Sequence, residues 1–122
     1  MKINLVAVTS IISSFGFRKV VSSALTVAPQ IEVDFVIPSL NLYSFRKMIF
    51  KSFDQKPCLE EPDLEAIGHH LGRADLVCFS SMTEDAEITK RIIAVIRRLN
   101  PKSFIVWGGI HPIADPEDSR RD

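Results

Sequence analysis

The chain has 122 residues, a length typical of one domain that buries its own core without metals or disulfides. Its 46% hydrophobic and 25% charged residues are ordinary for a globular protein. Since 15 basic residues balance 15 acidic ones, the chain lacks the excess of positive charge typical of nucleic-acid binders, and we expect no such partner.

The first predicted element is a strand over residues 3–8, a nearly continuous apolar run that suits a strand buried on both faces. A signal peptide is the weaker interpretation, because polar residues interrupt the apolar stretch and no clear cleavage site follows. No run of 18 apolar residues occurs, so we expect no transmembrane helix and no membrane partner.

A helix and a second strand are predicted next. Ser13 and Ser14 are candidate N-caps, and Pro29 ends the helix. Apolar residues recur between them at helical spacing: Phe17, Val20, Val21, Ala24, Leu25 and Ala28. Residues 33–37 form the second strand, closed by Pro38.

Residues 39–60 are the least legible part of the chain. Leu42, Phe45, Ile49 and Phe53 fit a short amphipathic helix. We favour a surface insertion with an apolar underside, and a helix that binds a partner or a membrane surface is the alternative.

The second half of the chain continues the alternation. We predict a helix from Pro62 to a stop at Gly72, a strand over residues 76–79, a helix capped by Thr83 and ended by Asn100, and a strand over residues 104–107. This order predicts a Rossmann/flavodoxin-like, three-layer α/β/α fold with a mainly parallel sheet of four visible strands. We expect residues 1–122 to be a single domain.

The two cysteines, Cys58 and Cys78, make neither a disulfide framework nor a zinc site. Cys78 lies in an apolar run and behaves there as a small hydrophobe. We therefore expect a reducing, cytoplasmic compartment and no metal ligands from the chain.

Ligands of parallel sheets bind outside the carboxyl ends of the strands, which directs attention to three loops, over residues 9–16, 80–83 and 108–115. The first begins with Thr9 and Ser10 and lacks both the dinucleotide glycine motif and the Walker lysine. The second offers Ser80, Ser81 and Met82, which bind a ligand or cap a helix. The third offers Gly108 and Gly109, which allow close approach or a tight turn.

The histidines and acidic residues give no catalytic set. His69 and His70 fit a structural role at a helix end. His111 follows the glycine pair and is either close to a ligand or an organiser of its loop. Asp115, Glu117 and Asp118 are interpreted as a solvated tail. No serine–histidine–acid set or carboxylate pair stands out, so we predict no catalytic residues.

Two segments carry a family resemblance: residues 74–83 (ADLVCFSSMT) and, after a helix, residues 105–112 (IVWGGIHP). They resemble the N-terminal cobalamin-binding domain of radical SAM proteins. Ser80-Ser81-Met82 is similar to the family's Ser-x-Leu element, and Gly108-Gly109 to its Gly-Gly element. The resemblance implies a pocket for the dimethylbenzimidazole tail of the cofactor, with Ser80 hydrogen-bonding near the base and the glycines making space.

The resemblance also implies a parent enzyme of methyltransferase or oxidoreductase type. Its downstream domain would carry the iron–sulfur cluster and S-adenosylmethionine, and this chain would be a module that is not catalytic on its own. The segment Thr9–Gly16 contains no histidine for a lower cobalt ligand, and no Cys-x-x-x-Cys-x-x-Cys motif occurs. The chain ends before the family's fifth strand, so we expect a fragment whose exposed sheet edge favours a homodimer.

Two alternatives from other classes stay open. One is a flavodoxin-like ligand-binding or signalling domain that does not bind cobalamin, although Thr9-Ser10 and Ser80-Ser81 stand where a phosphorylation receiver needs acidic residues. The other is a small free-standing enzyme that uses His111 with Ser80 or Ser81.

Overall fold

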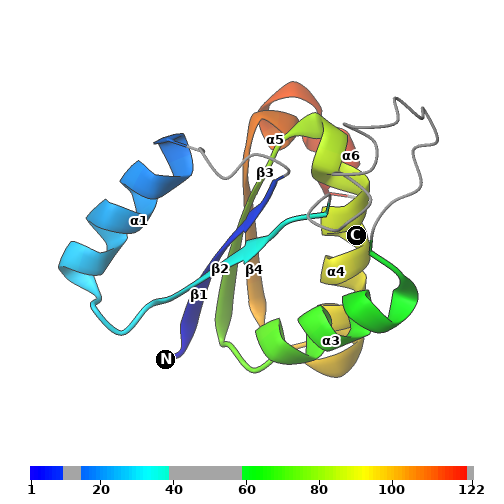
Figure 1. The fold of residues 1–122 in the computed structure, drawn as a ribbon, viewed down its shortest axis with the longest axis horizontal. Helices are drawn as coiled ribbons and strands as arrows, with labels where there is room; N and C mark the ends of the chain where they lie inside the picture. The colour runs from blue at the N-terminus through cyan, green and yellow to red at the C-terminus, as the bar shows by residue number, and fades with distance from the viewer. Residues whose placement is uncertain (10–14, 39–58, 121–122) are drawn as a thin grey trace, which may run out of the picture.

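Four parallel strands form one sheet in the computed structural model, which describes residues 1–9, 15–38 and 59–120 (Figure 1). The strands are β1 (Ile3–Val8), β2 (Glu32–Val36), β3 (Leu76–Ser81) and β4 (Phe104–Gly109), in the order β2-β1-β3-β4. The chain places β2 on one side of β1 and then places β3 and β4 on the other side. The direction in which strands are added therefore reverses between β1 and β3. In parallel sheets this reversal is where ligands bind.

Helices cover both faces of the sheet, which confirms the predicted three-layer fold. Helix α1 (Phe15–Val27) lies on one side, and α3 (Glu61–Leu71) and α4 (Ala86–Leu99) lie together on the other (Figure 1). Glu61 and Glu65 of α3 form ion pairs with Arg91 and Arg98 of α4. A short 3-10 turn, η1 (Thr83–Asp85), precedes α4, and two short helices, α5 (Ile110–Ala114) and α6 (Pro116–Ser119), follow β4.

The two faces of the sheet are unequally covered. The larger core lies against α3 and α4 and includes Val6, Val77 and Ile96. On the α1 side the buried cluster is small and centres on Leu5, Ala7 and Phe17. Helix α1 lies over the β1 half of the sheet. On the same face, two apolar side chains of β4 therefore remain exposed to solvent: Phe104 is 77% exposed and Val106 is 55% exposed. The α1 face is therefore where the fold leaves room beside the sheet.

Several predicted boundaries are corrected by the structure. Strands β3 and β4 extend through Ser81 and Gly109, because these ends pair with each other, Ser80 opposite Gly108 and Ser81 opposite Gly109. Thr83 does not cap α4, which starts after the η1 turn with Asp85 at its N-cap.

Other predictions fall partly outside the structure's range. The amphipathic residues Leu42, Phe45, Ile49 and Phe53, the candidate caps Ser13 and Ser14, and Ser10 lie outside the described residues.

Candidate functional site

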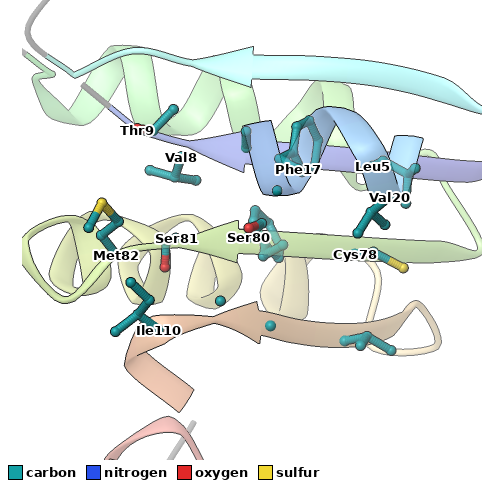
Figure 2. Close-up of a pocket in the computed structure, with 16 residues that line it drawn as sticks. Leu5, Val8, Thr9, Phe17, Val20, Cys78, Ser80, Ser81, Met82 and Ile110 are labelled. Carbon is teal, nitrogen blue, oxygen red and sulfur yellow. The ribbon is translucent and has the colours of Figure 1, made fainter. Parts of the chain in front are cut away.

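A cavity of about 750 Å³ lies between α1 and the carboxyl-terminal halves of β1, β3 and β4 (Figure 2). Its walls come from the two strands at the reversal point, from the adjoining strand β4 and from the first turns of α1. The lining residues are Leu5, Ala7, Val8, Thr9, Gly16, Phe17, Val20, Cys78, Phe79, Ser80, Ser81, Met82, Val106, Gly108, Gly109 and Ile110. The volume falls in the range of small-molecule sites.

The lining is mostly apolar, with a few polar atoms at the strand ends. Alternation along the strands points Leu5, Cys78 and Val106 toward the α1 side. Phe17 and Val20 of α1 lie near Leu5 and Cys78 (Figure 2). Thr9 and Ser80 bring hydroxyls to the lining, whereas the Ser81 hydroxyl accepts a hydrogen bond from Trp107. Such a surface suits a flat, largely apolar group that makes a small number of directed hydrogen bonds.

The two glycines at the end of β4 serve different purposes. Within 4 Å, a Cβ added at Gly108 would meet only the Phe79 carbonyl oxygen, at 3.8 Å. The fold therefore leaves open space at Gly108, and the missing side chain enlarges the cavity there. Gly109 has φ 108°, and a Cβ there would lie 2.4 Å from the Ser81 carbonyl oxygen. Gly109 is therefore required by the backbone, whereas Gly108 is free to serve a ligand.

Behind the cavity wall, polar contacts connect β3, β4 and the short C-terminal helices. The Trp107 indole Nε1 donates to the Ser81 Oγ at 2.9 Å, and the indole ring lies 5.3 Å from the His111 ring, centroid to centroid. His111 Nε2 is 3.0 Å from Asp118 Oδ2, and the Lys90 ammonium is 2.6 Å from the same oxygen. Hydrogen bonds from Lys90 and His111 hold the pKa of the Asp118 carboxyl below its usual range.

This network corrects the interpretation of the C-terminal acidic residues. Asp118 forms two ion-pair contacts, and the Asp115 side chain accepts a hydrogen bond from the Asp118 backbone at the start of α6. These two residues are parts of the fold, not a solvated tail.

Cys78 has a different environment on the cavity floor. Its side chain is half-buried, and burial raises the pKa of the thiol. At neutral pH the group stays protonated and acts as an apolar part of the wall.

The structure brings most of the predicted ligand residues together. Thr9, Ser80, Ser81, Met82, Gly108 and Gly109 all line the cavity. Ser10 lies outside the described residues. His111 is not among the lining residues and packs behind the wall on Trp107. His70 approaches Asp34 of β2 at 3.1 Å, in keeping with a structural position.

The sequence did not identify the apolar part of the lining. The helical spacing of Phe17 and Val20 and the apolar runs around Cys78 and Val106 predict buried core positions instead. The alternation of side chains along β4 could have indicated this lining. Every second residue from Phe104 onward faces the α1 side of the sheet, and where no helix covers that side these residues contact solvent or a ligand.

The described residues contain no group of three or more histidine, cysteine or acidic side chains that could hold a metal ion. They also contain no helix with the length and hydropathy needed to cross a bilayer.

Comparison with known proteins identifies a family. The family model described as "B12 binding domain" matches residues 2–122, nearly the whole chain. No curated protein and no solved structure matches it.

Proposed function

Because the chain belongs to the B12 binding domain family, and is thus a cobalamin-binding module, we propose that the cavity beside α1 receives the nucleotide tail of cobalamin. The observation that carries this proposal is Gly108. It lies on the cavity wall, its missing side chain leaves open space, and the fold itself does not require a glycine there.

The residues present fit such a group. A planar aromatic base needs an apolar slot, which Leu5, Phe17, Val20 and Val106 supply. Its few polar atoms need partners at one end, and the hydroxyls of Thr9 and Ser80 lie where β1 and β3 end. Ser80 stands directly opposite Gly108 across the strand pair, so the donor and the open space adjoin.

The role of the chain is to bind and orient. Bound cobalamin supplies methyl-group carriage or radical chemistry, and the protein contributes position and a dry environment. In the described residues nothing forms a catalytic set around the cavity, and the segment Thr9–Gly16 offers no histidine as a lower cobalt ligand. We infer a cofactor held by its tail and not by a bond from the protein to cobalt.

We further propose that the module works within a radical SAM parent. The similarity of Ser80-Ser81-Met82 and Gly108-Gly109-Ile110-His111-Pro112 to that family's cobalamin domains supports this assignment. Such a parent would hold an iron–sulfur cluster and S-adenosylmethionine in another domain. Iron and sulfide analysis of the native full-length protein tests this; a full-length protein without iron or sulfide would contradict it.

Titration with hydroxocobalamin tests the binding site itself. We expect saturable binding, retention of the cofactor on a desalting column and a base-off visible spectrum. Weaker binding by Gly108→Val, with unchanged thermal unfolding, would place the tail beside Gly108. Saturable binding that Gly108→Val leaves unchanged would move the tail elsewhere, and no binding by the folded wild-type chain would contradict the proposal.

A further inference from the structure

The only tryptophan of the chain lies directly behind the cavity wall. Trp107 belongs to β4 and faces the α3–α4 side of the sheet, where it packs against the larger core. Its indole N–H donates to the Ser81 hydroxyl at 2.9 Å, and Ser81 is 4% exposed. The bond crosses from β4 to β3 at the last residue of β3.

The indole is itself held in place from the other side. The His111 ring lies against it at 5.3 Å with an interplanar angle of 32°. The His111 side chain is 8% exposed, and its Nε2 contacts Asp118, which also pairs with Lys90 of α4. Trp107 of β4 and Asp118 of α6 contact the His111 ring, and Lys90 of α4 holds Asp118. These contacts hold the His111 ring in place, and the His111 ring supports the indole.

The consequence for the cavity follows from strand alternation. Neighbouring residues of a strand point to opposite faces, so anchoring Ser81 toward Trp107 directs Ser80 toward α1 and the cavity. Figure 2 shows the two serine side chains pointing in different directions from the end of β3. The same anchor holds the end of β3 against the glycine pair of β4.

We propose that Trp107 is a positioning residue of the ligand site: through Ser81 it orients the Ser80 hydroxyl and the Gly108 wall for the bound ligand. The inference rests on the proposed function for its ligand, but it assigns a role to Trp107, which does not itself line the cavity. Trp107 and His111 are not among the lining residues, so their effect on binding is transmitted through the strand ends.

Three variants and a matched control test the proposal. Trp107→Phe keeps an aromatic ring against His111 and removes the donor; Ser81→Ala removes the acceptor; the third variant combines both. Ser103→Ala is the control, because Ser103 is equally buried and donates a 3.0 Å hydrogen bond to the Ala74 carbonyl at the opposite end of β4. Thermal unfolding of all four measures the purely structural cost.

The first readout needs no ligand. In ¹⁵N-resolved NMR spectra, Trp107→Phe and Ser81→Ala are expected to shift the backbone amide signals of Ser80 and Gly108, and Ser81→Ala to shift the single indole N–H signal. Ser103→Ala leaves all three in place. Unchanged Ser80 and Gly108 signals in Trp107→Phe would overturn the proposal, whatever the chain binds.

The second readout is the Kd for hydroxocobalamin. Each single variant is expected to weaken binding about fivefold, the factor lost when the Ser80 hydroxyl no longer makes one ordinary hydrogen bond to the ligand. The double variant is expected to lose no more than either single one, because all three break the same contact. Full-strength binding by Trp107→Phe, or independent losses that multiply, would overturn the positioning role. Failure of the wild type to bind would contradict the proposed function instead, and the amide signals would still decide the positioning role.

Discussion

Replacing Gly108 separates ligand binding from folding, because the fold does not need a glycine at this position of the cavity wall. The added Cβ of Gly108→Val would have the Phe79 carbonyl oxygen at 3.8 Å as its nearest neighbour, an ordinary van der Waals contact. The new methyl groups would point into the cavity, where the tail is proposed to lie. Overfilling a packed site costs about 1 to 3 kcal/mol, so the Kd should rise about 5- to 150-fold while the Tm changes little.

The matched variant is Gly109→Ala, one residue further along the same strand. Here the Cβ would lie 2.4 Å from the Ser81 carbonyl oxygen at a φ of 108°, so the cost falls on the fold. Backbone strain of this kind costs about 1 to 3 kcal/mol, which lowers the Tm by roughly 5 to 15 °C. Isothermal titration calorimetry and thermal unfolding measure both quantities. A large Tm loss in Gly108→Val, or a Gly109→Ala protein as stable as the wild type, would refute the reasoning.

Three further predictions concern the thiol, the acidic residue behind the wall and the sheet edge. Since burial raises the pKa of Cys78, we expect iodoacetamide to alkylate the thiol slowly at neutral pH, and more slowly still with cobalamin bound. Mass spectrometry of the Cys78 peptide measures the alkylation rate. Equal rates with and without ligand would contradict a ligand at the cavity floor. The lowered pKa of Asp118 means that its stabilising effect is present above the ordinary aspartate range and is lost as the pH falls through the lowered pKa. Asp118→Asn should therefore be less stable than wild type at pH 7, and the gap should close in acid; a gap that is constant with pH in urea titrations would disprove the linkage. Within the described part of the chain no strand pairs with the outer edge of β4, and Phe104 is exposed. We therefore expect the protein to self-associate as its concentration rises, and Phe104→Lys to reduce this self-association. A wild-type protein that stays monomeric at all concentrations in light scattering would exclude self-association through this edge.

The strands and longer helices could be predicted because each has a strong local pattern, whereas the short helices α5 and α6 lie where the sequence predicts a loop and a tail. The apolar run of β1 and the regular apolar spacing of α4 identify a buried strand and an amphipathic helix without any tertiary information. The strand ends could not be predicted, because glycine has low strand propensity and these residues join the sheet through long-range pairing: Ser80 and Ser81 pair with both β1 and β4, and Gly108 and Gly109 pair with β3.

The site could be predicted only in part for a similar reason. The rule for parallel sheets places Ser80, Ser81 and the glycines at the edge of the sheet where the cavity lies. The contacts from Lys90 to Asp118, from Asp118 to His111 and from Trp107 to Ser81 join elements whose order in space no local pattern encodes. The apolar lining could not be predicted from the sequence, because an apolar side chain that faces a ligand has the same chemistry as one that faces the core.

The central place of β1 in the sheet has a consequence for how the protein is made. Ile3 pairs with Leu76, 73 residues later, so β1 can complete its hydrogen bonds on that side only after β3 has been synthesised. At the usual rate of translation this takes about 4 to 15 seconds. Throughout that time one of the most apolar segments, Leu5 to Val8, has an open edge, and unpaired apolar strands of nascent chains are the ones that aggregate. Among the four strands of the described sheet, β1 thus waits longest between its own synthesis and the completion of its pairing.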